Sequence, residues 1–178
     1  MTQNLSQHID SISVLIEKSI SKVAYYEINY DEGFWKNSDH HSLDHGLEFT
    51  MSNNEKYYLA WDNLQIQYDL NFGTGTLQQL LGPESNVAIH DVTGNIYWQE
   101  LVGRKIKKLT PILSWVSTNG IKKDYLQDLI IEFDNKQKVI ISVSEIRDGS
   151  VFGMQDHISV FFNSNTAKKY GIGVENEL

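Results

Sequence analysis

The densest group of side chains that could do chemistry lies in the stretch DHHSLDH, from Asp39 to His45. Imidazole and carboxylate groups are the usual protein ligands for zinc and related ions. On a helical turn, His41 and His45 would share one face of the helix. The sequence around them predicts neither a helix nor a strand, and no second set of ligands stands out. A short tract of this kind is a compositional signal alone, so we expect a polar surface loop that binds no metal.

Other motifs that could carry chemistry are incomplete. The stretch FGTGTL, Phe72 to Leu77, lacks the Gly-Lys-Ser/Thr of a P-loop and the three glycines of a dinucleotide-binding turn. No serine occupies a G-x-S-x-G elbow, and no pair of acids is singled out for glycoside chemistry. The sequence has no cysteine, which excludes a disulfide framework and a thiolate nucleophile. We therefore expect a protein that is not an enzyme and that uses no cofactor.

Length and charge set further limits. The 178 residues are 40% hydrophobic and 11% aromatic, which is typical of a folded protein, and we expect a single domain over residues 1–178. The formal net charge of −8 argues against nucleic acid or an anionic membrane as partner, because phosphate binding needs clustered Lys and Arg. The same charge permits a basic protein as partner. Neither a signal peptide nor an apolar run of membrane-spanning length is recognisable, so we expect a cytoplasmic protein.

Hydrophobic periodicity predicts an α+β fold, mostly antiparallel β-sheet with a few short helices. A helix is expected from Leu5 to Ile20, because isoleucines recur there at close to helical spacing. Strands and hairpins are expected over Lys22–Tyr30, Phe49–Trp61, Leu64–Phe72, Asn86–Leu101, Leu101–Ser117, Leu126–Ile146 and Asp156–Phe162, with short helices after Phe72 and Phe162. A polar loop is expected over Asp31–Gly46.

Similar segments recur in the same order in both halves of the chain. The hairpins FTMSNNEKYYLAW and EFDNKQKVIISV share their apolar alternation and turn chemistry. Leu15–Val23 precedes the first hairpin as Leu101–Leu109 precedes the second, and the third block aligns Leu70 with Val160. We interpret this as an internal repeat, 5–82 and 96–178, of two β-rich halves that share one core. The alternative is that any two amphipathic hairpins look alike.

The loop Asp31–Gly46 also combines an aromatic side chain with carboxylates, a composition that suits a protein-binding surface. The candidate partner-binding residues are Asp31, Glu32, Trp35, Asp39 and Asp44. The other tryptophans, at positions 61, 98 and 115, lie in or beside expected strands and are expected in the core.

Three segments of the C-terminal half resemble segments of a known class of protein. ISVFFNSNTAKKYGIG, LIIEFDNKQKVIIS and LVGRKIKKL are similar to stretches of small bacterial immunity proteins from polymorphic and contact-dependent growth inhibition toxin systems. The resemblance implies a cytosolic inhibitor that binds a cognate toxin domain, often a nuclease whose basic cleft is covered by acidic residues. It carries over no functional residues. The alternatives are a small metal- or ligand-binding protein or enzyme that uses the Asp31–Gly46 loop, and an assembly module.

The interface hypothesis predicts that Trp35→Ala weakens binding of the partner and leaves thermal stability unchanged, because an exposed anchor contributes to the complex rather than to the fold. Calorimetric binding and thermal melting of the variant measure the two quantities separately. A lower melting temperature with unchanged affinity would instead place Trp35 in the core.

Overall fold

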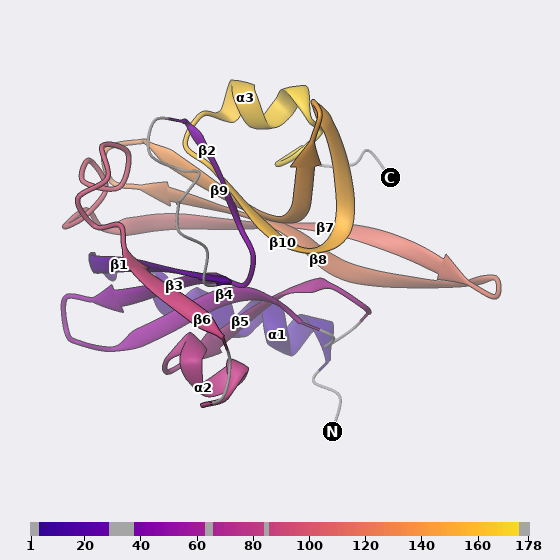
Figure 1. Ribbon diagram of the computed structural model, residues 1–178, viewed down its shortest axis with the longest axis horizontal. Coiled ribbons are helices and arrows are strands. Elements are labelled where there is room, and N and C mark those ends of the chain that lie inside the picture. Colours follow the sequence, from indigo (N-terminus) through magenta and orange to yellow (C-terminus); the bar gives the residue numbers. More distant parts are fainter. Residues whose placement is uncertain (1–3, 29–37, 63–65, 84–85, 175–178) are drawn as a thin grey trace.

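The computed structural model describes residues 4–28, 38–62, 66–83 and 86–174, and it contains two five-stranded antiparallel sheets and three short helices in these ranges (Figure 1). The N-terminal sheet has the order β5-β4-β3-β1-β6, with β1 Ile20–Ile28, β3 Gly46–Met51, β4 Lys56–Asp62, β5 Asp69–Thr74 and β6 Val87–Asp91. The C-terminal sheet has the order β2-β10-β9-β8-β7, with β2 His40–Leu43, β7 Ile106–Thr118, β8 Ile121–Phe133, β9 Lys138–Arg147 and β10 Ser150–Phe161. The predicted α+β class is confirmed.

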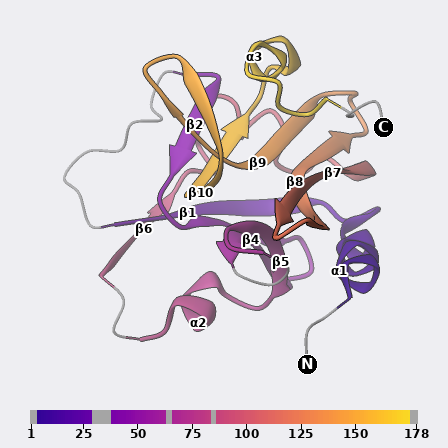
Figure 2. The same ribbon diagram turned by 90° about the vertical axis from the view of Figure 1, so that its right-hand side faces the viewer.

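The two sheets lie one above the other and enclose the main core (Figure 2). Val23, Tyr25 and Phe49 of the N-terminal sheet pack in one cluster with residues such as Ile131 and Phe133 of the C-terminal sheet. All of these side chains are fully buried. Alternation along each strand supplies the apolar face, since successive side chains point to opposite sides of a sheet.

The first helix, α1 (Leu5–Ile12), is shorter than the sequence predicts. Asn4 caps its N-terminus, and a single 3₁₀ turn over Ser13–Leu15 follows it. Glu17 then takes a left-handed backbone conformation with φ of 65°, and Ile20 begins β1 with its side chain fully buried in the core. The predicted helical spacing of Ile20 was therefore wrong, because packing between the sheets overrides the local periodicity there.

Three other local predictions also differ from the structure. The strand predicted over Leu64–Phe72 begins at Asp69 as β5, after a turn in which Tyr68 has a φ of 61°. The other two concern His40–Leu43 and Asn86–Leu101. The tract His40–Leu43, predicted as loop, forms strand β2 at the edge of the C-terminal sheet, where Leu43 pairs with Ile158. The predicted hairpin over Asn86–Leu101 contains one strand, β6, and the following residues form turns that bury Trp98 in the core. In both segments the tertiary partner decides the structure, because β2 pairs with β10 and β6 pairs with β1.

The remaining two helices follow a strand of the N-terminal sheet and a strand of the C-terminal sheet. α2 (Leu77–Leu81) comes after β5, and the side chain of Gln79 accepts a hydrogen bond from the Thr76 backbone N–H at its start. α3 (Ser164–Lys169) comes after β10, and Asn163 caps it by accepting from the Asn165 backbone N–H. α3 covers the face of the C-terminal sheet that is turned away from the core (Figure 2).

The strand order repeats as the sequence comparison expects. The series β1-β3-β4-β5 and β7-β8-β9-β10 are both antiparallel meanders, and the register shifts after Ile20 in one series and after Ile106 in the other. The hairpin turns also use the same bonds, since Met51 N–H donates to Glu55 O and Phe133 N–H donates to Gln137 O. These correspondences support an internal duplication, which itself stays a prediction.

The third block of the sequence alignment is out of register by two residues. Leu70 pairs with Trp61 in the N-terminal sheet, and Ile158 pairs with Val143 at the corresponding place in the C-terminal sheet. The sheets therefore match Leu70 to Ile158 rather than to Val160. Two residues is the repeat of side-chain orientation along a strand, so the misalignment keeps the same face and leaves the apolar pattern unchanged.

Candidate functional site

Of the five predicted partner-binding residues, Asp31, Glu32 and Trp35 lie outside the described residues. Asp39 lies just before β2, and its Oδ2 accepts a hydrogen bond from Thr166 Oγ1 at 2.7 Å. The backbone O of Asp39 accepts from Phe162 N–H at 2.9 Å. Asp39 thus ties the start of β2 to α3, and its predicted contact with a partner stays a prediction.

Asp44 lies directly after β2 and bonds to the N-terminal sheet. Its Oδ2 accepts from the Ile28 N–H at 3.0 Å, and its backbone O accepts from Trp61 Nε1 at 2.7 Å. Its Oδ1 lies 3.6 Å from His157 Nε2 on β10. With a side chain only 17% exposed, Asp44 offers little surface to a partner, and its contacts link the two sheets.

A second carboxyl group lies beside Asp44. Glu27, on β1, is nearly buried, and its Oε2 accepts the Asp44 backbone N–H at 2.9 Å. Its Oε1 has no hydrogen-bond partner within the described part of the chain. Burial, followed by the neighbouring Asp44 carboxyl, raises the pKa of Glu27 to about 9. Glu27 is therefore protonated at neutral pH, because an ionised carboxylate there would be desolvated and beside a like charge.

The histidines of the Asp39–His45 tract point apart, since neighbouring side chains on a strand face opposite sides of the sheet. His40 Nε2 lies 3.2 Å from Ser159 Oγ, whereas His41 is buried with its Nδ1 2.7 Å from the hydroxyl of Tyr25. Burial lowers the pKa of His41 to about 4, so its imidazole is neutral at neutral pH. Within the described ranges, no three histidine, aspartate or glutamate side chains are arranged to hold a metal ion.

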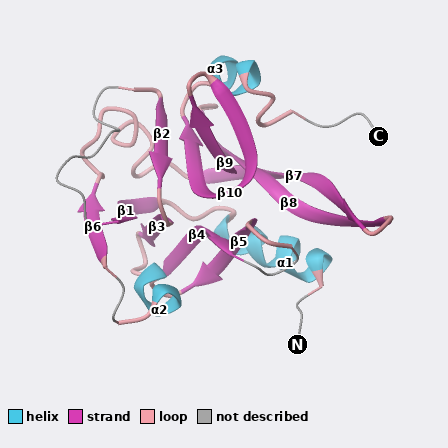
Figure 3. Ribbon diagram, turned by 45° about the vertical axis from the view of Figure 1, so that its right-hand side comes forward, coloured by secondary structure: helices cyan, strands magenta, loops and turns pink. Residues whose placement is uncertain are grey.

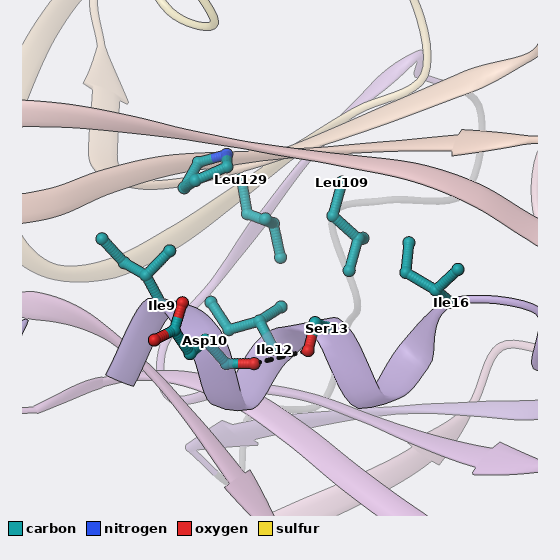
Figure 4. Close-up of a pocket in the computed structure, with 8 residues that line it drawn as sticks. Ile9, Asp10, Ile12, Ser13, Ile16, Leu109 and Leu129 are labelled. Atoms are coloured by element: carbon teal, nitrogen blue, oxygen red, sulfur yellow. Dashed lines mark hydrogen bonds between the residues drawn. The ribbon is translucent and has the colours of Figure 1, made fainter. Parts of the chain in front are cut away.

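A largely apolar hollow lies between α1 and β7, and we call it the α1–β7 groove. It measures about 270 Å³ and is lined by Ile9, Asp10, Ile12, Ser13, Ile16, Leu109, Pro111 and Leu129. The isoleucines point from the helix and its 3₁₀ extension toward Leu109 and Leu129 on the strands above (Figure 4). The Ser13 hydroxyl donates to the Asp10 carbonyl, so its proton is not available to a ligand in the groove. Six of the eight lining residues are apolar, which suits an apolar occupant.

Beyond the groove, β7 and β8 continue as a two-stranded ribbon, residues 113–126, which we call the arm. β8 pairs with β9 only over Asp128–Glu132, whereas β7 and β8 pair as far as Thr118 and Ile121. The arm therefore projects past the rest of the C-terminal sheet (Figure 3).

Trp115, on β7, gives the arm an exposed aromatic side chain. It lies four residues after Pro111, the last residue of β7 that lines the groove, and the register irregularity between Ile112 and Leu113 separates the two. Trp115 is 53% exposed, although its strand position predicted a core residue, and Lys122 Nζ lies 5.3 Å from its ring centroid. Ile16, at the far end of the groove, is 36% exposed. We call the groove and Trp115 together the apolar strip, since exposed apolar surfaces of this kind mark interaction sites.

The open edge of β7 before the arm is protected against pairing with another strand. β7 is the outermost strand of its sheet, and an open edge is a template for strand addition. Pro111 has no N–H to donate at that edge, and Lys107 and Lys108 begin the strand. The strip therefore suits a partner that packs against side chains better than one that adds a strand.

Sequence patterns alone do not identify the apolar strip as a site. The isoleucines at positions 9, 12 and 16 were recognised as a helical face, yet their spacing does not reveal which of them stays accessible. The apolar alternation through Leu113 and Trp115 was recognised as a strand. The sequence does not show that β7 and β8, each thirteen residues long, extend beyond the part of β8 that pairs with β9.

No known family, curated protein or solved structure matches this chain. In the part of the chain that the structure describes, no helix combines the length and apolar character that crossing a membrane requires.

The raised pKa of Glu27 predicts how stability depends on pH. A carboxyl whose pKa rises on folding contributes most stability below its unfolded pKa, near 4.5, and loses that contribution as the pH rises through its folded pKa near 9. Relative to Glu27→Gln, the wild type should lose about 1.4 kcal/mol of unfolding free energy per pH unit across this range. Urea unfolding at pH 5, 7 and 9 measures the difference.

Glu55 provides the control for this prediction. The hydrogen bond from Lys18 lowers the pKa of Glu55 to about 2, so its carboxylate stays charged from pH 5 to 9. Glu55→Gln should therefore change stability by the same amount at each pH. A pH-independent offset for Glu27→Gln as well would show that Glu27 is ionised in the fold.

Proposed function

We propose that this protein is an immunity-type inhibitor that neutralises a cognate toxin domain by direct protein–protein binding. The observation that carries the proposal is the apolar strip, which combines the α1–β7 groove with the exposed ring of Trp115 on the arm. Aromatic side chains beside an apolar hollow are the usual energetic centre of a protein interface. The segment resemblance described above supplies the class of partner.

The charge of the chain supports the same proposal. A net charge of −8 favours encounter with a basic partner, and nuclease toxins present a basic cleft to their nucleic acid. The long-range electrostatic field would then orient the two proteins during encounter, and contacts of the apolar strip would provide the affinity. The alternative of a metal- or ligand-binding site in the Asp31–Gly46 loop gains less support, since Asp39, His41 and Asp44 each bond within the chain.

The proposal predicts that Trp115→Ala weakens binding of the cognate toxin domain by tenfold or more, because the removed ring is an anchor of the interface. Its melting temperature should stay close to that of the wild type, because an exposed side chain contributes little to the fold. Ile121→Ala is the matched control, since Ile121 is 71% exposed on the same arm and its position in the alternation puts it on the other side. Calorimetric titration compares the three proteins.

The partner is found by capture on the immobilised protein and mass spectrometry, and is then expressed alone and together with this chain. We expect one stoichiometric protein that stops growth when expressed alone and is neutralised by co-expression. A captured protein without toxicity, or equal losses of affinity for Trp115→Ala and Ile121→Ala, would contradict the proposal.

A further inference from the structure

A second cavity lies on the other face of the C-terminal sheet, beneath the chain that follows α3. It measures about 270 Å³. Its lining comes from β7, β8, β9, β10 and the C-terminal loop: Ile112, Leu113, Ser114, Tyr125, Gln127, Asp128, Ser144, Val151, Gly153, Tyr170, Gly171, Ile172 and Val174. The cavity adjoins the small apolar cluster that α3 and Ile172 form on the sheet. It shares no lining residue with the α1–β7 groove, and Leu113, Ser114 and Tyr125 at the base of the arm form one side of it.

Two buried polar atoms in this lining lack a partner. Asp128 is 2% exposed, and its Oδ2 accepts the Gly173 N–H at 2.7 Å. Its Oδ1 and the hydroxyl of Ser144, which is fully buried, form no hydrogen bond with the described residues. Burying a polar group without a partner costs about 1–3 kcal/mol, and more for a charged group. Two such atoms in one cavity indicate a missing complement that donates hydrogen bonds.

The missing complement is also cationic. Asp128 is the single charged side chain among the described residues that line the cavity. Burial raises the pKa of Asp128 to about 6, against the smaller lowering effects of the Ser142 hydroxyl and the Gly173 amide. When Asp128 is ionised, no opposite charge faces it from the described residues that line the cavity. A desolvated carboxylate without a countercharge is among the most costly arrangements in a protein interior.

The rest of the lining decides between classes of cation. Calcium takes six to eight oxygen ligands, far more than one carboxylate oxygen and one hydroxyl supply. Zinc prefers imidazole and thiolate groups, and the lining contains neither histidine nor cysteine. Much of the remaining wall is aliphatic or aromatic, including Ile112, Val151 and Tyr170, and Ser114 and Gln127 add polar groups. This lining suits a ligand whose cationic end is small and whose remaining part is apolar.

We infer that this cavity binds a primary ammonium group on a slender aliphatic stem, with Asp128 Oδ1 and Ser144 Oγ as acceptors of its N–H groups. The same chemistry is present in a free alkylamine and in a lysine side chain. The inference does not rest on the proposed toxin inhibition, because Asp128 and Ser144 do not line the groove and a small amine tests the cavity without the toxin.

The test is a titration of isotopically labelled protein, followed by amide chemical shifts, with n-butylammonium chloride at pH 7.5. We expect saturable shifts at Asp128, Ser144 and Gly173, and none with 1-butanol, which has the same stem without the charge. Asp128→Asn should weaken binding at least tenfold, because the ion pair is lost. Asp124→Asn is the matched control, since Asp124 is an exposed acid four residues earlier on β8.

Ser144→Ala keeps Asp128 and its bond to Gly173, so it tests the site even if Asp128→Asn fails to fold. It should weaken butylammonium binding severalfold while the spectrum stays that of a folded protein. Nα-acetyl-lysine methyl ester separates the two sources: binding as tight as butylammonium indicates a lysine side chain, and weaker binding indicates a free amine. Equal shifts with 1-butanol, no shifts at all, or unchanged affinity in both variants would overturn the inference.

Discussion

The structure depends on the antiparallel junction between the starts of β1 and β7. Ser19 and Lys105 form a β-bridge there, with Glu17 N–H donating to Ile106 O and Gly103 N–H donating to Ile20 O, both at 2.8 Å. The two hydrogen bonds are equivalent, because Glu17 and Ile20 of the first meander correspond to Gly103 and Ile106 of the second. Glu17 and Gly103 also both have positive φ. The junction therefore has the character of a two-fold axis. Each meander leaves it in the opposite direction, so their apolar faces meet and close the core.

The surfaces follow from this closure. Because β1 is flanked by β3 and β6, it is central, whereas β7 has β8 on one side and is an edge strand. α1 precedes β1 and comes to lie beside that edge, with the groove between them. The arm extends β7 and β8 past the second sheet, which leaves Trp115 without an opposing layer. On the far face, α3 and the loop after it cover part of the sheet and enclose the cavity around Asp128.

Sequence patterns predicted the elements that local chemistry determines. Phe49–Trp61 alternates and carries a turn with Asn53, so its hairpin is recognisable without any partner. His40–Leu43 has weak strand propensity and becomes β2 because β10 offers it an edge. Trp98 and Trp115 both look like core residues because both lie in predicted strands. Trp98 is buried by the turns after β6, whereas Trp115 lies on the arm, beyond the part of β8 that pairs with β9. Asp128 follows Gln127 and precedes the apolar run Leu129–Ile131, so no sequence pattern singles it out, and its unsatisfied oxygen depends on groups from several strands.

The central claim is that the apolar strip of α1, β7 and the arm binds a protein partner. Hydrogen–deuterium exchange of the protein alone and in complex with its captured partner tests this claim most directly. The account predicts new protection along α1 and in residues 113–117, with little change in the chain that follows α3. Protection confined to residues 38–46, with the strip exchanging as in the free protein, would contradict it.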